Sequence, residues 1–151
     1  MTTLLVVRHG QTAWNRDRRF RGREDLGLDE TGVEQAKLVA RRIAASYQPV
    51  AIYTSPLERA ARTAEIVARR LGLDGQLHEG LLDLDYGDLT GLSPTEAEAR
   101  HPSTYRTWLA APHVVRFPNG ESLADVGNRV ARLLQQLRMD HAEEQVVLVS
   151  H

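Results

Sequence analysis

The sequence contains no cysteine, which excludes disulfide frameworks, thiolate nucleophiles and thiolate zinc sites together. It also lacks an excess of either charge, because 19 Lys and Arg residues stand against 20 Asp and Glu residues. That balance gives no sign of binding to nucleic acid or to an anionic membrane. No stretch approaches the roughly 18 apolar residues of a membrane span, and the first residues have no basic, apolar leader. We therefore expect a soluble, cytoplasmic protein.

Hydrophobic residues make up 42% of the 151 residues, which is enough for one core, so we expect a single domain. Continuous apolar runs, typical of strands buried on both faces, occupy 4–7, 50–54 and 146–149, and a short edge strand is expected at 77–79. Apolar residues at helical spacing predict further elements. The first is a helix over 31–47, whose start is marked by Thr31 and Glu34. A second helix is capped by Ser55-Pro56, short helices follow Ser93, and a further helix follows Ser122.

Strands that alternate with amphipathic helices predict an α/β fold of three layers, a mostly parallel sheet with helices on both faces. In such sheets, ligands bind beyond the carboxyl ends of the strands. Polar residues follow three of the expected strands, namely Arg8-His9, Thr54-Ser55 leading to Arg59, and Ser150-His151. An imidazole at this edge can attack a phosphorus atom if neighbouring cations neutralise the phosphoryl oxygens. The sequence therefore predicts an anion site at this edge.

Five ordered motifs give this prediction a family context. Arg8-His9-Gly10, continued by Thr12, Trp14 and Asn15, resembles the RHG signature of the histidine phosphatase superfamily in its phosphoglycerate mutase-like form. The other four segments are 28–36, 55–64 with Ser55-Pro56-Leu57-Glu58-Arg59-Ala60, the Gly120-Glu121-Ser122 loop, and 146–151. The similarity covers nearly the whole chain, and five motifs in order are far more specific than one.

The resemblance implies that His9 becomes phosphorylated while Arg8, Arg59 and His151 hold the phosphoryl group, with no metal or other cofactor. It also implies a substrate-binding pocket whose further members are Thr12, Asn15, Arg21, Gly22 and Tyr86. The expected substrate is a small phosphorylated molecule.

The family also has an acid that protonates the leaving oxygen, usually a glutamate four residues before a glycine. Asp83 stands at that place before Gly87, and Asp85 is the local competitor. The chemistry asks for a carboxyl that is protonated when the alkoxide leaves and deprotonated when it activates water.

Asp83-x-Asp85 resembles a metal site only superficially, because Leu84 is apolar and no His pair lies close in the sequence. The basic run from Arg16 to Arg23 either attracts a second anionic group of the substrate or is a solvated loop.

Three functions follow from these residues. A phosphatase resolves the phosphohistidine with water, whereas a cofactor-dependent phosphoglycerate mutase returns the phosphoryl group to a sugar acid. Mutases carry paired arginines and a lysine for the second anion, but this sequence has Pro94 where the lysine aligns and no adjacent arginines between Thr95 and Glu121. The third function, a catalytically inactive module that binds phosphorylated ligands, is disfavoured by the presence of His9.

The sequence ends on His151, directly after an apolar run. In the family that it resembles, a glycine and a helix follow at this point. We therefore expect residues 1–151 to be a single histidine phosphatase domain whose C-terminal part is missing, with an uncovered apolar region that favours a homo-oligomer.

Overall fold

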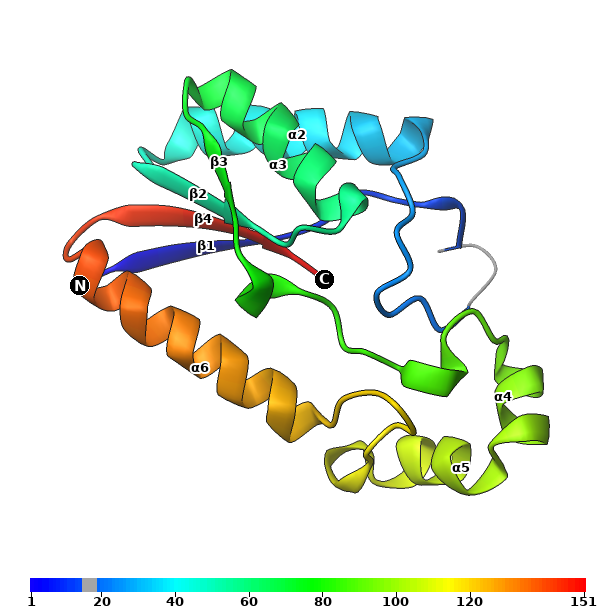
Figure 1. Cartoon of the computed structure of the whole chain (residues 1–151). Coiled ribbons are helices and arrows are strands. Elements are labelled where there is room, and N and C mark those ends of the chain that lie inside the picture. The colour runs from blue at the N-terminus through cyan, green and yellow to red at the C-terminus, as the bar shows by residue number, and fades with distance from the viewer. Residues whose placement is uncertain (15–18) are drawn as a thin grey trace.

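Four parallel strands form the centre of the structure, which is a computed structural model describing residues 1–14 and 19–151. The strands are β1 (Thr3–Arg8), β2 (Ala51–Thr54), β3 (Gly75–Leu77) and β4 (Gln145–Ser150), in the sheet order β1-β4-β2-β3. The central strand β4 is buried from Val146 to Val149, as its apolar sequence predicts. All four carboxyl ends point to the same edge of the sheet (Figure 1).

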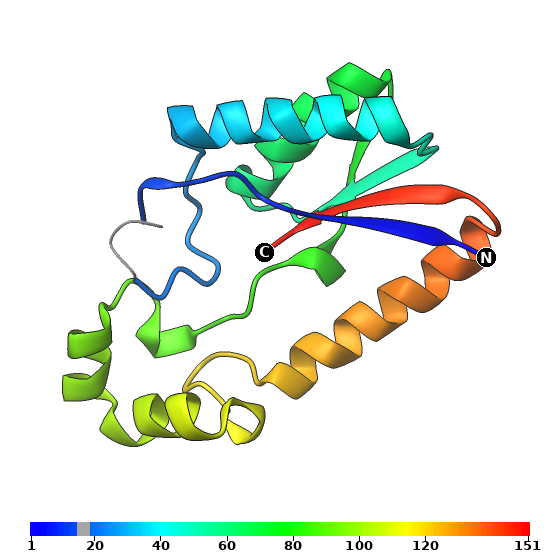
Figure 2. The same cartoon turned by 180° about the vertical axis from the view of Figure 1, so that it is seen from behind.

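Helices cover both faces of this sheet, which confirms the predicted three-layer α/β fold (Figures 1 and 2). On one face, α2 (Glu30–Ser46) and α3 (Glu58–Leu71) pack their small and branched residues, such as Ala40, Ile43 and Val67, against β1, β2 and β4. On the other face, α6 (Leu123–Asp140) contributes Leu133 and Leu137 to a second cluster. The sheet is thus held between two apolar layers.

A group of short helices lies beyond the carboxyl ends of the strands, away from the sheet (Figure 1). It comprises the 3₁₀ turns η2 (Gly87–Leu89) and η3 (Pro112–Val114) and the helices α4 (Pro94–Arg100) and α5 (Pro102–Ala110), whereas the turn η1 (Glu79–Leu81) packs against β4 and α6. This region has its own apolar cluster, built around Leu89, Ala97 and Phe117. It therefore forms a separate wall that faces the edge of the sheet where the site was predicted.

The predicted ends of several helices and strands were wrong, and so was the predicted burial of β1. Strand β1 is not buried on both faces, because it lies at the edge of the sheet and Val6 is 74% exposed. Helix α2 is capped by Asp29, whose carboxylate accepts a hydrogen bond from the backbone of Gly32, so that Thr31 is already helical. Helix α3 begins two residues after Pro56, at Glu58. The edge strand is β3, two residues before its predicted place.

The capping box predicted at Ser93 is present, and Ser122, predicted to cap the next helix, also forms a capping box. Each serine side chain accepts a hydrogen bond from the backbone N–H three residues on, and the serine's own backbone N–H donates to the carboxylate of that residue, Glu96 or Asp125. Side-chain caps of this kind satisfy the free N–H groups of the first helical turn, so α4 and α6 start where the sequence indicates.

Two glycines bring the loop after β1 into direct contact with the first turn of α2. A Cβ atom on Gly10 would lie 2.3 Å from the carbonyl oxygen of Gly32, and one on Gly32 would lie 2.2 Å from the carbonyl oxygen of Gln11. Both distances are too short for any side chain. The absence of a Cβ atom at both positions therefore sets the distance between helix α2 and the residues that follow His9.

We predict that Gly32→Ala lowers the free energy of unfolding by about 1–3 kcal/mol, because the added methyl group pushes α2 from the loop. The matched control is Gly127→Ala in α6, where a Cβ atom meets nothing within 4 Å. There the gain in helix propensity should raise stability by up to about 1 kcal/mol. Urea denaturation followed by circular dichroism measures both. Equal effects of the two substitutions would contradict a role for the close approach.

Candidate active site

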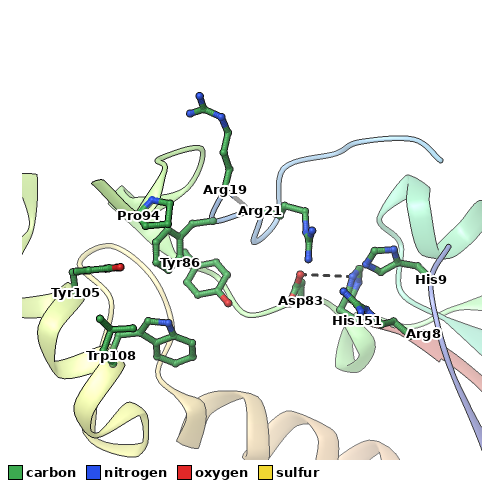
Figure 3. Close-up of a pocket in the computed structure, with 12 residues that line it drawn as sticks. Arg8, His9, Arg19, Arg21, Asp83, Tyr86, Pro94, Tyr105, Trp108 and His151 are labelled. Carbon is green, nitrogen blue, oxygen red and sulfur yellow. Dashed lines mark ion pairs between the residues drawn. The ribbon is translucent and has the colours of Figure 1, made fainter. Parts of the chain in front are cut away.

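A cavity of about 350 Å³ opens where the carboxyl ends of β1 and β4 face the short helices (Figure 3). Its walls come from segments that are far apart in the sequence. The lining residues are Arg8, His9, Arg19, Phe20, Arg21, Asp83, Tyr86, Pro94, Tyr105, Trp108, Leu109 and His151. The cavity lies at the edge of the sheet where parallel α/β folds bind their ligands.

His9 follows the last residue of β1 and is buried in the floor of the cavity, with 6% of its surface exposed. Its Nδ1 atom lies 2.7 Å from the carbonyl oxygen of Gly10. Since a carbonyl oxygen only accepts, Nδ1 carries the proton and Nε2 keeps its lone pair. Burial lowers the pKa of His9 to about 4, and the positive charges of Arg59, Arg21 and Arg8 act in the same direction. The ring is therefore neutral, and its tautomer suits a nucleophile.

His151 follows β4, and its ring centroid lies 5.2 Å from that of His9. Its Nδ1 atom accepts a hydrogen bond of 3.1 Å from Nε of Arg59, because a guanidinium can only donate. Nε2 then carries the proton and donates to Oγ of Ser55 at 2.9 Å. Burial, followed by the charge of Arg59, lowers the pKa of His151 to about 2. The opposite tautomers of the two rings give them different capacities, His9 to attack and His151 to donate.

Arg59 is completely buried and lies behind the cavity rather than in its wall. Besides its bond to His151, the guanidinium donates to the carbonyl oxygens of Gly22 and Glu24, both at 2.8 Å, and to Oδ2 of Asp83 at 3.0 Å. The prediction placed Arg59 at this edge of the sheet, in the first turn of its helix, and the structure does so. Its guanidinium forms hydrogen bonds with other residues of the protein, of which Asp83 and His151 line the cavity.

Asp83 lines the cavity, with Oδ2 3.7 Å from Nδ1 of the neutral His151 ring (Figure 3). Asp85 does not line it. Its side chain accepts a hydrogen bond from the backbone of Gly87 and lies 3.6 Å from the guanidinium of Arg23. Of the two carboxylates left open by the sequence, Asp83 is the one that lines the cavity beside His151.

The basic run after His9 divides into side chains with different surroundings. Arg21 extends toward Asp83 and His9 in Figure 3, and its buried Nε has no hydrogen-bond partner among the described residues. Arg19 also lines the cavity but points outward, where it bonds to the carbonyl oxygen of Gly91 and to Glu96. Arg21 is thus a charged donor that an anion in the cavity would satisfy.

The remaining predicted site residues are placed differently. Tyr86 lines the cavity, and burial, followed by the negative charge of Asp83, raises the pKa of its hydroxyl. Thr12 and Gly22 are buried and do not line it, although the carbonyl oxygen of Gly22 holds Arg59. Asn15, with Arg16 and Arg18 of the basic run, lies outside the described residues.

Of the residues in the far wall of the cavity, only Pro94 was singled out from the sequence. This wall is formed by Phe20, Pro94 and three residues of α5, namely Tyr105, Trp108 and Leu109. A signal was available, because Tyr105 and Trp108 are three residues apart on a predicted helix and so share one face.

A second set of contacts holds the segment that carries Asp83. The guanidinium of Arg129, on α6, donates to the carbonyl oxygens of Gly80 and Asp83 at 2.9 and 3.0 Å. Arg129 also pairs with Glu121, whose other oxygen accepts a bond from the backbone of Asp85 at 3.1 Å. The Glu121 motif was identified from the sequence, but its contact with this segment was not.

Within the described residues, no group of three or more His, Asp or Glu side chains is placed to hold a metal ion. None of the helices in the described ranges combines the length and apolar character that crossing a membrane requires.

Two histidines, arginines and a carboxylate at one sheet edge are the groups that phosphoryl transfer through a histidine requires. A model of the histidine phosphatase superfamily (branch 1) matches residues 4–151. The chain therefore belongs to the histidine phosphatase superfamily, as its motifs predict.

Named relatives have different activities. The chain is 38% identical over 151 residues to phosphoserine phosphatase 1 of Hydrogenobacter thermophilus, covering all of this chain and 71% of that protein. It is 36% identical over 155 residues to a 2,3-bisphosphoglycerate-dependent phosphoglycerate mutase of Brucella ovis, covering 99% of this chain and 75% of that protein. Among solved structures, Bacillus stearothermophilus YhfR superposes with a TM-score of 0.94 at 34% identity, covering 100% of this chain and 74% of that one.

Proposed function

We propose that the chain is a phosphatase that hydrolyses small phosphate monoesters through a phosphohistidine on His9, without a metal ion. The observation that carries this proposal is the state of His9: a neutral ring whose proton is held on Nδ1 by Gly10. The Nε2 atom of His9 carries no proton, and His9 lines the cavity together with Arg8, Arg21 and His151. A relative named phosphoserine phosphatase supports the same class of reaction.

In the first step, Nε2 of His9 attacks phosphorus, so that a P–N bond forms while the P–O bond to the alcohol breaks. Asp83 gives its proton to the leaving oxygen. Arg8 and Arg21 neutralise the charge on the phosphoryl oxygens, which is the task that a metal ion performs in other phosphatases. His151 contributes a further donor once its Nε2–H exchanges Ser55 for a phosphoryl oxygen.

In the second step, a water molecule attacks the phosphohistidine, and Asp83 takes one of the water protons. The P–N bond breaks, and inorganic phosphate leaves while His9 returns to its neutral form. Arg59 acts from behind the cavity, because its bonds to Asp83 and His151 hold both side chains toward the reacting group.

Hydrolysis is supported over the mutase reaction by the far wall of the cavity. A mutase must hold a second anionic group while the phosphoryl group moves. Pro94, which stands where the mutases have a lysine, lines the cavity and offers no charge. An inactive phosphate-binding module is less well supported, because the free Nε2 of His9 provides the nucleophile that such a module lacks.

We predict that His9→Ala abolishes hydrolysis and that rapid quenching with a labelled ester gives an acid-labile phosphoryl group on His9 alone. Activity of the parent chain should survive excess chelator, because arginines supply the positive charge. His113→Ala, which removes an exposed histidine outside the cavity, is the matched control and should keep both activity and labelling. A phosphoryl group on Ser or Asp, or a requirement for magnesium, would refute the proposal.

For the acid, Asp83→Asn should slow alkyl phosphates, whose alkoxides need a proton, far more than aryl phosphates with acidic phenols. The matched variant Asp85→Asn removes the carboxylate that bonds to Gly87 and should affect both ester classes alike. Plots of rate against leaving-group pKa for the three proteins measure this difference. If Asp85→Asn steepens the plot and Asp83→Asn does not, the roles of the two carboxylates are reversed.

A further inference from the structure

Aromatic rings form the wall of the cavity opposite the two histidines. Tyr86 and Trp108 are in edge-to-face contact at 6.0 Å between ring centroids, and Trp108 packs in the same way on the buried Phe117 at 5.4 Å. Phe20 contacts Tyr86 at 5.0 Å and Tyr105 at 6.3 Å. These five rings, out of eight aromatic residues in the sequence, are held against one another.

The cavity therefore has two chemically different ends (Figure 3). Arg8, His9 and His151 lie at one end, and Tyr105 and Trp108 of α5 lie at the other, with the Tyr86 ring between them. A phosphoryl group bound by the first end directs the alcohol part of its ester toward the second. Whatever fills the aromatic end is thus attached to the phosphate through the bond that breaks.

The charges at the aromatic end exclude one class of alcohol. Among the described lining residues, Asp83 is the only carboxylate, and it lies at the histidine end. Arg19 is already paired with Glu96 and with the carbonyl oxygen of Gly91. An ammonium group at this end would meet ring faces but no carboxylate with which to form an ion pair, and burying a charge without an ion-pair partner is costly.

Apolar surface at the same end is left open to solvent. Leu109 lines the cavity and is nonetheless 66% exposed, and no residue of α5 is buried. An apolar group placed on this wall removes both its own surface and that of the wall from water. The cavity volume of about 350 Å³ is at the lower end of the usual range for ligand sites, about 300–1,000 Å³, which suits a phosphate with one ring system.

We propose that Tyr105 and Trp108 form the binding site for the alcohol part of the substrate, and that the preferred substrates are phosphate monoesters of alcohols bearing an uncharged ring. This inference rests on the proposed phosphatase activity and names the substrate class of that same site. It separates the chain from a phosphatase for phosphoserine, whose ammonium group would find no carboxylate at the aromatic end.

The test compares alkyl esters whose leaving oxygens are chemically similar, so that differences report binding rather than leaving-group reactivity. The substrates are 2-phenylethyl phosphate, ethyl phosphate and phosphoserine. The parent chain should hydrolyse the phenylethyl ester with a kcat/KM at least about tenfold above that of ethyl phosphate, because the ring is buried on the wall. Phosphoserine should be no better than ethyl phosphate.

Trp108→Ala should remove most of the advantage of the phenylethyl ester, chiefly through KM, so that the ratio of its kcat/KM to that of ethyl phosphate falls toward one. Tyr105→Phe keeps the ring and should retain the preference, whereas Tyr105→Ala should weaken it. Leu38→Ala on α2, an exposed apolar residue outside the cavity, is the matched control and should change neither substrate. Circular dichroism of each variant shows that it is folded.

Each outcome decides between the two proposals. If no ester is hydrolysed by the parent chain, the phosphatase proposal fails. If ethyl phosphate and phosphoserine are hydrolysed as well as the phenylethyl ester, or Trp108→Ala leaves the preference intact, the phosphatase proposal stands and the aromatic site is refuted.

Discussion

The guanidinium of Arg59 is the interaction on which the rest of the site depends. It is completely buried, and it bonds to two loop carbonyls, Gly22 and Glu24, and to the side chains of Asp83 and His151. A buried charge is tolerated only when its donors are satisfied, so the segments that follow β1, β3 and β4 must all converge on α3. The convergence that neutralises Arg59 is also what places the carboxylate and the histidine around one cavity.

A second arginine, the half-buried Arg129, holds the part of the Asp83 segment that Arg59 does not contact. Arg59 holds the side chain of Asp83, whereas Arg129 holds its backbone and Glu121 holds the backbone of Asp85. The segment around Asp83 has little regular structure of its own, so these bonds supply the order that a helix or strand would otherwise provide. The carboxylate is thereby fixed from two sides, by α3 through its side chain and by α6 through its backbone.

The sequence determines those parts of the site that depend on where strands end. His9 and His151 could be predicted to meet because parallel strands share one carboxyl edge, and both ends are marked by apolar runs. The environment of Arg59 could not be predicted, since its place in the first turn of a helix does not tell whether the guanidinium faces the cavity or the loop carbonyls. Trp108 was missed because α5 is short and packs on no strand. Val6 was misjudged because an apolar run does not distinguish an edge strand from a central one.

In the proposed reaction, hydrolysis proceeds by two successive displacements at phosphorus, with His9 as the intermediate carrier. Each in-line displacement inverts the configuration at phosphorus. The most direct measurement is the stereochemical course of hydrolysis for a phosphate ester made chiral at phosphorus with sulfur and oxygen isotopes, in isotopically labelled water. Two displacements predict net retention of configuration. Net inversion would show a single displacement by water and would contradict a covalent intermediate on His9.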